Sequence, residues 1–393
     1  MFGARKALNG RVNAPSVACV IRLWSNQSNA REATLDRRSF MKTAGVGAAA
    51  TGALAAPAIA QNTQVVRMVT TWPRNFPGLG TGAQRVADRI TAASGGRIEV
   101  KLFAAGELVP ALECFDAVAT GAAEMYHGAD YYWQGKHLGY NFFTAVPLGF
   151  TAQELEAWVH FGGGQELWDE LGAQFGVKGF LAGNTGPQMG GWFREPVTSL
   201  DDMKGLNFRM PGLGGEVMRQ LGANVVLLSG GEIFPALQAG TIDGTEWVGP
   251  YNDMAFGFQN ILKNYMYPGF HEPGSGLAVG MNMGWWDSLS DADKALVEAC
   301  CSAENDMMTA EYNARNGAAL DQLINEHGVS LHRFPEEVWN EIAGIADEVV
   351  RNAHDDDLGK RIVDSYFAFR ENVRPYSQIS EQAYMNARRD ALG

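Results

Sequence analysis

The sequence predicts a two-lobed α/β protein in which each lobe has a mostly parallel sheet of its own. Strand-like and helix-like segments alternate over residues 65–127, and the alternation restarts over residues 177–248. Such alternation is typical of parallel sheets with helices on their faces. The strand-like segment Leu277–Met283 then reads as a crossover that returns the chain to the first block. We therefore expect two α/β domains with crossover strands, followed by long C-terminal helices.

The first 60 residues differ in charge and pattern from the rest. They hold eight basic and two acidic side chains, so the formal net charge of −13 becomes −19 for residues 61–393. Arg37-Arg38 precedes a Gly/Ala-rich, weakly apolar stretch, and Ala58-Ile59-Ala60 forms a small-x-small cleavage site. This order predicts a twin-arginine signal peptide over 1–60 and export to the periplasm. An Ala-rich helix with a chance arginine pair is the alternative interpretation.

The strongly acidic remainder of the chain excludes several classes of partner. Non-specific nucleic-acid binding needs clustered positive charge, so no nucleic-acid partner is expected. Docking on an anionic membrane surface is disfavoured for the same reason. There is no run of ~18 apolar residues, so no ordinary spanning helix is expected either. Three of the four cysteines, Cys114, Cys300 and Cys301, follow the leader, and we read them as small buried hydrophobes.

The first block is read from its periodicity. Alternating β-rich segments predict strands, and apolar residues at helical spacing predict helices that stop at glycines. The expected strands are Val65–Thr71, Ile98–Phe103 and Ala123–His127, and the expected helices are Thr81–Ala93, Ala111–Ala119 and a long Gln153–Gly172.

The second block repeats this pattern with shorter strands. We expect strands at Val177–Ala182, Gly190–Arg194, Leu206–Met210, Ala223–Leu227 and Asp243–Val248, and helices at Gly214–Leu221 and Glu232–Ala239. Long helices follow at Ser290–Glu326, Pro335–Ala353 and Asp357–Ala387. These segments predict a first lobe at 61–180, completed by about 275–393 with its bracing helices, and a second lobe at 181–274. The Ser290–Glu326 helix could brace both lobes or join a dimer.

No motif in the chain indicates catalysis. Gly78–Ala83 suggests a dinucleotide loop but lacks the third glycine and is separated from its strand by prolines. Walker A, HExxH and GxSxG patterns are absent from the sequence, and its seven histidines are scattered. Ligands of open α/β sheets bind at the carboxyl ends of strands, which here would face each other across a cleft. Carboxylates brought together there by the fold remain able to act as acid and base.

Three polar residues stand at predicted strand ends. Arg209 ends an apolar strand, and its planar fork suits a small carboxylate. Gln188 and Glu246 offer hard oxygen ligands suited to sodium or calcium. A cation between a ligand carboxylate and Glu246 would offset the repulsion of two buried anions. A surface ion pair for Arg209, a structural amide for Gln188 and a strand-end salt bridge for Glu246 stay open as alternatives.

Several segments resemble one known family. They are Gly106–Leu112, Leu206–Gly212 and Gly240–Pro250. The chain resembles the DctP-type solute receptors of TRAP transporters over nearly all of 61–393, and most of all the receptors for 2-oxo acids. The resemblance implies a periplasmic-binding-protein fold and delivery of a ligand to a sodium-driven membrane permease. It also implies that Arg209 grips the ligand carboxylate.

The same resemblance implies a cation site. Gln188, Glu246 and the backbone carbonyl of Trp247 would hold a cation that also touches the ligand. That cation is sodium in the 2-oxo acid receptors and calcium in a lactate-binding relative. Dimers occur within the 2-oxo acid branch, so a homodimer is expected here.

Aromatic residues are candidates to wall the cleft, since they present apolar surface with a polar tip. The candidates are Trp72, Phe76, Tyr131, Tyr132 and Trp133, and ordinary core packing is an equal alternative for them. Glu272 is a further candidate for the cleft.

The sequence therefore predicts a periplasmic receptor, not an enzyme. Its ligand would be a small 2-oxo or 2-hydroxy monocarboxylate, such as pyruvate or lactate, bound with sodium or, alternatively, calcium. A secreted enzyme using carboxylates of the cleft, and a module that presents a ligand to a sensor, are the rival hypotheses.

Overall fold

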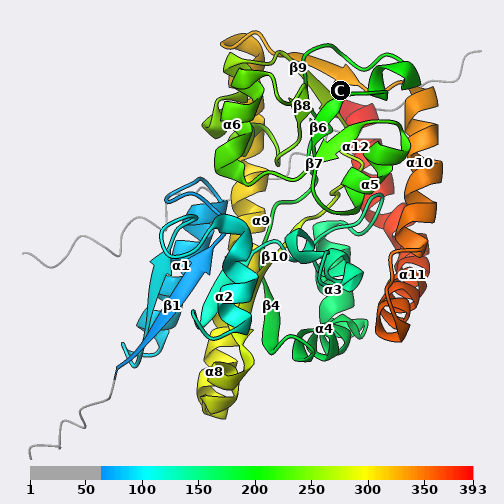
Figure 1. The fold of residues 1–393 in the computed structure, drawn as a ribbon. Coiled ribbons are helices and arrows are strands. Elements are labelled where there is room, and N and C mark those ends of the chain that lie inside the picture. The colour runs from blue at the N-terminus through cyan, green and yellow to red at the C-terminus, as the bar shows by residue number, and fades with distance from the viewer. Residues whose placement is uncertain (1–62, 393) are drawn as a thin grey trace, which may run out of the picture. The chain divides into compact units, whose positions relative to one another are not determined.

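The computed structural model describes residues 63–392 (Figure 1). The predicted twin-arginine signal peptide, residues 1–60, lies outside the described residues. Within the described part, the strands form two sheets, each with its own helices. This arrangement confirms the two-lobed α/β fold.

The first sheet has the strand order β2-β1-β3-β10-β4. The strands are β1 (Gln64–Thr70), β2 (Ile98–Phe103), β3 (Met125–Gly128), β4 (Val177–Asn184) and β10 (Gly276–Asn282), and the helices between them include α1 (Leu79–Ala93) and α2 (Cys114–Ala119). β1 runs parallel to β2 and β3, as the alternating pattern predicts. The predicted crossover is confirmed, because β10 pairs antiparallel with both β3 and β4.

Two predictions for this region were wrong. β4 lies in the first sheet and does not open the second block, because it pairs with the returning strand β10 along its length. The single helix expected over 153–172 is two helices, α3 (Ala152–Phe161) and α4 (Gly164–Ala173). They are divided at Gly162-Gly163, where Gly163 has a φ of 83°, a left-handed conformation that favours glycine.

The second sheet has the order β11-β9-β5-β8-β6-β7. Its strands are β5 (Gly191–Phe193), β6 (Asn207–Arg209), β7 (Asn224–Val226), β8 (Gly244–Thr245), β9 (Asn264–Tyr267) and β11 (Ser330–Arg333), and its helices include α5 (Gly212–Gln220), α6 (Gly230–Ala239) and α7 (Pro250–Phe256). β6 is parallel to β7 and β8, whereas β5 runs antiparallel to β8 and β9.

The C-terminal third is shared between the two sheets. β11, which the sequence did not predict, pairs with β9 at the edge of the second sheet, so residues 275–393 do not all complete the first lobe. The helices are α8 (Met283–Ser288), α9 (Asp291–Asn325), α10 (Glu336–Arg351), α11 (Asp357–Ser377), a π-helical segment (Gln378–Gln382) and α12 (Ala383–Leu392).

The helix α9 is 35 residues long and continuous, as predicted. It packs on α1 and β4 of the first lobe and on α7 of the second, so it braces both (Figure 1). Buried Glu304 fixes it to α1, because Arg85 and Arg89 donate to its carboxylate at 2.6 and 2.5 Å. Among the described residues, no helix combines the length and the apolar character needed to cross a membrane.

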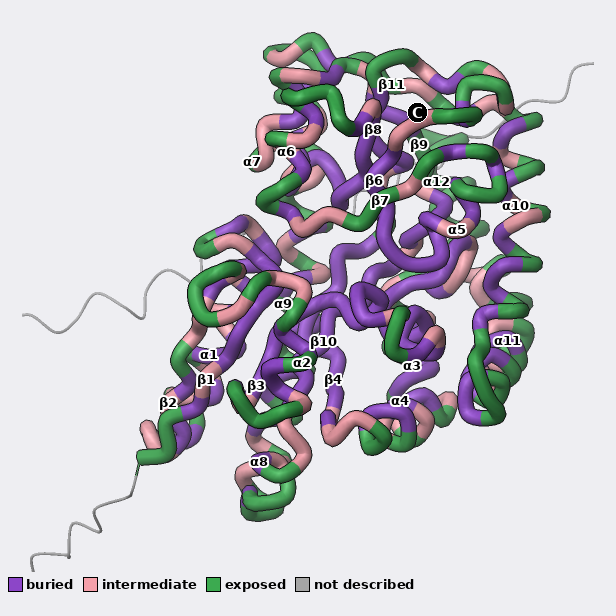
Figure 2. Tube along the Cα trace, viewed as in Figure 1, coloured by how far each residue is buried: buried purple, intermediate pink, exposed green. Residues whose placement is uncertain are grey.

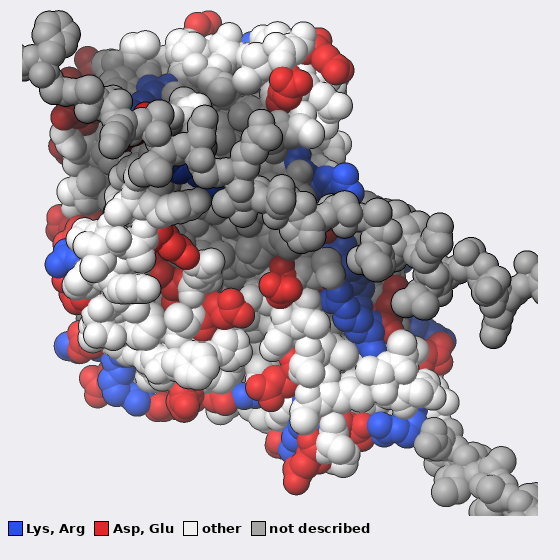
Figure 3. All heavy atoms as spheres, turned by 180° about the vertical axis from the view of Figure 1, so that it is seen from behind, with Lys and Arg blue, Asp and Glu red and all other residues white. Residues whose placement is uncertain are grey.

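The central strands of both sheets are largely buried, whereas the edge strands β7 and β11 are mostly exposed (Figure 2). The three described cysteines are buried thiols, and burial raises the pKa of Cys114 to about 12. On the face shown in Figure 3, the described acidic and basic side chains are interspersed and do not form one basic patch. The buried polar residues of the described chain include Gln188, Arg209, Glu246, His271 and Glu272, which form the candidate site.

Candidate binding site

Arg209 and Glu246 meet because their strands are parallel neighbours. Arg209 ends β6 and pairs in register with Thr245 of β8, so Glu246 follows directly beyond the pair. Arg209 Nη1 forms an ion pair with Glu246 Oε1. Arg209 Nε donates to the Leu228 carbonyl at 3.1 Å. The side chains of Arg209 and Glu246 are 1% and 0% exposed. The ion pair of Arg209 is therefore buried, and the alternative of a surface ion pair is excluded.

The Arg209 guanidinium remains charged and incompletely bonded. Burial acts to lower its pKa, but the Glu246 carboxylate more than compensates and the pKa lies above its usual value. Its carbon lies 5.1 Å from the centre of the Trp247 ring, a cation–π contact. Nη2 is buried and has no hydrogen-bond partner within the described part of the chain. A buried donor without a partner is costly, so this group suits an anionic ligand.

Gln188 lies in the segment that leads from β4 to β5. Its Nε2 donates to Glu272 Oε2 at 2.8 Å and to Thr185 Oγ1 at 3.2 Å. Its backbone N–H donates to the Glu272 carbonyl at 3.0 Å, which joins the two segments that cross between the lobes. The Gln188 Oε1 atom is buried and accepts no hydrogen bond from residues 63–392. An acceptor of this kind suits a hard cation.

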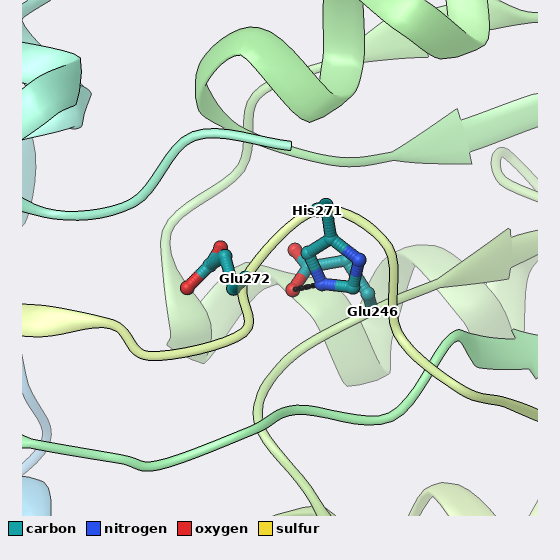
Figure 4. A group of neighbouring side chains, drawn as sticks. All are labelled: Glu246, His271 and Glu272. Atoms are coloured by element: carbon teal, nitrogen blue, oxygen red, sulfur yellow. Dashed lines mark hydrogen bonds and ion pairs between the residues drawn. The ribbon is translucent and has the colours of Figure 1, made fainter. Parts of the chain in front are cut away.

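A cluster of three titratable side chains adjoins this amide (Figure 4). One ligand atom from each of Glu246, His271 and Glu272 lies within 4.8 Å of the others, and all three residues are buried. His271 Nε2 lies 3.2 Å from Glu246 Oε2. Burial raises the pKa of Glu272 to about 7, and the Glu246 carboxylate adds to this effect. Burial opposes a charged His271, but both glutamates raise its pKa above the usual value. The cluster can thus accept positive charge.

His271 was missed by sequence reasoning. It stands in an irregular segment between β9 and β10, with no motif around it, and the histidines were dismissed as scattered. Its position beside the candidate Glu272 was the one signal that could have drawn attention to it.

A small cavity lies between the lobes. Its volume is about 220 Å³, and the lining side chains leave little of that space open. The lining residues are Trp72, Leu79, Tyr131, Tyr132, Thr185, Gln188, Trp247, Val248, Ser275 and Leu277. Pockets that hold drug-sized molecules run to roughly 300–1,000 Å³, so the cavity is nearly closed in this structure and must widen to admit a ligand. A hollow of about 930 Å³ beside α5 and α10 is larger, but its charged pair, Glu216 and Arg219, is solvent-exposed.

The structure separates the predicted aromatic residues. Tyr132 and Trp247 line the cavity, as do Trp72 and Tyr131. Trp133 lies instead in the core of the first lobe, where its Nε1 donates to the Leu112 carbonyl at 2.8 Å. Phe76 does not line the cavity either. Its ring packs across the lobe boundary, 4.2 Å from the ring of Phe256 and 6.2 Å from that of Trp247.

Comparison with known proteins shows the family of the chain. Residues 68–356 match the family model of the bacterial extracellular solute-binding proteins, family 7. The monocarboxylate 2-oxoacid-binding periplasmic protein of Nostoc sp. is 38% identical over 362 residues, which cover 90% of this chain and 98% of that protein.

Solved structures extend the comparison. A TRAP transporter solute-binding protein of Bordetella bronchiseptica is 33% identical with a TM-score of 0.82, over 84% of this chain and 98% of that one. It forms a mixed-occupancy dimer with copurified calcium and picolinate. A TRAP periplasmic solute-binding protein of Pseudoalteromonas atlantica, with bound sodium and pyruvate, is 36% identical with a TM-score of 0.80, over 82% and 99% of the two chains.

Proposed function

Because the chain belongs to family 7 of the bacterial extracellular solute-binding proteins, we propose that it binds a small 2-oxo monocarboxylate between its lobes and delivers it to a TRAP permease. The observation that carries this proposal is the buried, charged Arg209, whose Nη2 has no acceptor in the described part of the protein. A ligand carboxylate would satisfy that donor. The family consists of solute receptors and not of enzymes.

A cation is part of the proposal, and the donor set fits one. Gln188 Oε1, the Glu246 carboxylate and the Trp247 carbonyl would supply oxygen ligands of the kind that sodium and calcium prefer. The orphaned, buried Gln188 Oε1 supports this assignment. When bound, the ion would supply positive charge between the ligand carboxylate and the nearby glutamates, whose mutual repulsion otherwise opposes binding. The two solved relatives with sodium and with calcium support either ion.

The first lobe would close the site. Trp72, Tyr131 and Tyr132 form its wall of the cavity, and they exclude water from the charged groups of the second lobe. Electrostatic attraction is stronger where water is excluded. The cavity is so small that ligand entry requires the lobes to move apart, which is the usual hinge motion of two-lobed receptors.

A screen of ligands and cations tests the function. Purified protein, unfolded and refolded to strip carried-over ligand, is heated with pyruvate, 2-oxobutyrate, lactate or succinate, each with sodium, calcium or chelator. A ligand at ~100 times its Kd should add about 2.7 kcal/mol of stability and raise the Tm by several degrees. We expect the largest rise with a 2-oxo acid plus a cation. No rise with any monocarboxylate would contradict the proposed function.

Export and assembly complete the proposal. The family is extracytoplasmic, and Arg37-Arg38 would direct export by the twin-arginine route. Replacing both arginines by lysine should leave precursor in the cytoplasm, and normal export of that variant would contradict this route.

A second copy would cover the C-terminal helices. Large apolar side chains are exposed there, with Tyr376 at 73%, Ile379 at 76% and Tyr384 at 63%. The dimeric Bordetella relative supports such a contact. The wild-type protein should run as a dimer in light scattering, and Ile379→Glu should run as a monomer with unchanged pyruvate affinity. A monomeric wild-type protein would contradict the assembly.

A further inference from the structure

Asp253, on α7, is a buried side chain that makes four hydrogen bonds. It is 1% exposed. Its Oδ1 accepts from the backbone N–H groups of Val248 and Gly249, both at 3.1 Å. Its Oδ2 accepts from Trp192 Nε1 at 2.9 Å and from the Tyr265 hydroxyl at 2.6 Å. One carboxylate thus joins a turn of backbone to two aromatic side chains.

The turn held by Oδ1 follows a very short strand. β8 has only two residues and ends at Thr245, and α7 begins at Pro250. The N–H groups of Val248 and Gly249 therefore fall between a strand and a helix, where regular structure gives them no acceptor. Asp253 supplies that acceptor from inside α7. Without Asp253, two buried backbone N–H donors would lose their acceptor, and each unsatisfied donor would reduce the stability of the folded protein.

The other oxygen of Asp253, Oδ2, is hydrogen-bonded to side chains of the second sheet. Trp192 of β5 and Tyr265 of β9 are paired in register, and their rings stack with centroids 4.1 Å apart. Both side chains are 0% exposed. Packed strands of a sheet move little relative to each other. Because Asp253 is bonded to two of them, it also restrains the turn at residues 246–249.

This turn carries the proposed cation ligands of the second lobe. Glu246 contributes its carboxylate and Trp247 its carbonyl. The Val248 carbonyl also accepts from the Met189 N–H at 3.0 Å, so the same turn fixes the segment that presents Gln188. All the proposed ligands therefore depend on the position of residues 246–249.

We propose that Asp253 is a positioning residue for the cation site, which holds the 246–249 turn in its binding conformation before any ion arrives. The inference rests on the proposed function, because it presupposes a cation held by Glu246 and Trp247. Asp253 itself touches neither ion nor ligand. Its effect should appear as a change in cation affinity, since a preformed turn spares the ion the cost of ordering its ligands.

The test measures pyruvate affinity by calorimetry over a range of sodium concentrations at constant ionic strength, and repeats the series with calcium. Asp253→Asn keeps the size of the side chain but turns an amide NH₂ toward the donors of Trp192 or of the turn. We define the cation midpoint as the cation concentration at which the pyruvate association constant reaches half of its maximum. In Asp253→Asn we expect this midpoint to rise about tenfold or more. At saturating cation, pyruvate affinity should return to within about threefold of wild type.

Asp130→Asn is the matched control. Asp130 is 0% exposed and also accepts from a tyrosine and a tryptophan, at 2.8 and 3.1 Å, but it lies in the first lobe. This variant should lower the Tm without moving the cation midpoint by more than about twofold. A wild-type midpoint in Asp253→Asn, or an equal shift in Asp130→Asn, would overturn the inference.

Two further outcomes are informative. Wild-type protein that binds pyruvate without any cation dependence would overturn the cation site and this inference together, while leaving the Arg209 contact intact. If Asp253→Asn does not fold, amide hydrogen exchange of the wild-type protein tests whether the turn is ordered before an ion binds. The Val248 and Gly249 amides should be protected without cation or ligand, and exchange at the rate of a free peptide would overturn the proposal.

Discussion

In the described part of the chain each lobe buries one aspartate, and the two are held by similar donors. In the first lobe Asp130 accepts from Tyr126 and Trp168, whereas in the second Asp253 accepts from Tyr265 and Trp192. Asp253 also accepts from two backbone N–H groups of the turn at 246–249. Burial raises the pKa of both carboxyls, to about 7 for Asp130 and to about 6 for Asp253. The additional donors favour the ionised form of Asp253.

The two lobes also differ in the charge of the groups that they place near the cavity. The first lobe presents uncharged groups, among them Trp72, whose Nε1 donates to His127 Nδ1 at 2.8 Å. Burial lowers the pKa of His127 to about 4, so that histidine is neutral near pH 7. The second lobe supplies Trp247 and Val248 to the lining. Its charged pair, Arg209 and Glu246, is buried and does not itself line the cavity, and the Arg209 guanidinium contacts the Trp247 ring. The comparison supports the proposal that the second lobe recognises the charge of the ligand, while the first lobe encloses and shapes it.

Removing the charge of the second lobe should have the largest effect. Arg209→Met should weaken pyruvate binding at least about 1,000-fold, because truncating a buried charged hydrogen-bond partner costs ~4 kcal/mol or more at the upper end of such sites. Calorimetry measures the affinity, and circular dichroism checks folding. Arg219→Met, which removes an exposed arginine of α5, is the control and should bind normally. Retained affinity in Arg209→Met would remove the site assignment and with it the contrast between the lobes.

Asp130 should make the stability of the protein depend on pH. Its carboxyl holds a proton up to about pH 7 when folded but ionises near its ordinary value of 3.8 when unfolded. The folded state is therefore favoured below pH 4 and loses stability as the pH rises toward 7, by about 2 kcal/mol between pH 5 and pH 7. Asp130→Asn should flatten this part of the profile in urea unfolding. An unchanged slope would show that Asp130 ionises as readily in the folded protein as in the unfolded chain.

Weakening contact between the lobes should have the smallest effect. The Phe76 ring packs on Phe256 across the boundary, and Asn252 Nδ2 donates to the neighbouring Pro77 carbonyl at 2.9 Å. Phe76→Ala should favour the open form and lower pyruvate affinity about tenfold, or about 1.4 kcal/mol, mainly through faster dissociation in stopped flow. The exposed Phe161 provides the control, and Phe161→Ala should change nothing. A shifted cation midpoint in Phe76→Ala would indicate that the first lobe also orders the cation ligands.

Much of the fold followed from local patterns. The bounds of β2 agree with the expected segment, and α1, β10 and α9 were predicted within two residues at each end. The very short strands were harder to delimit, because two or three residues carry little periodicity. β9 and β11, each of four residues, were missed altogether. β11 is a largely exposed edge strand without an apolar face.

The sequence by itself determined which groups stand at the strand ends, including Arg209 and Glu246, because a strand and the residue after it are neighbours in the chain. Tertiary structure decided which of them meet. It placed β4 in the first sheet, moved Trp133 into the core, and brought His271 to Glu246 and Asp253 to Trp192. Such contacts join residues tens of positions apart, and they depend on the packing of whole sheets, which local periodicity does not encode.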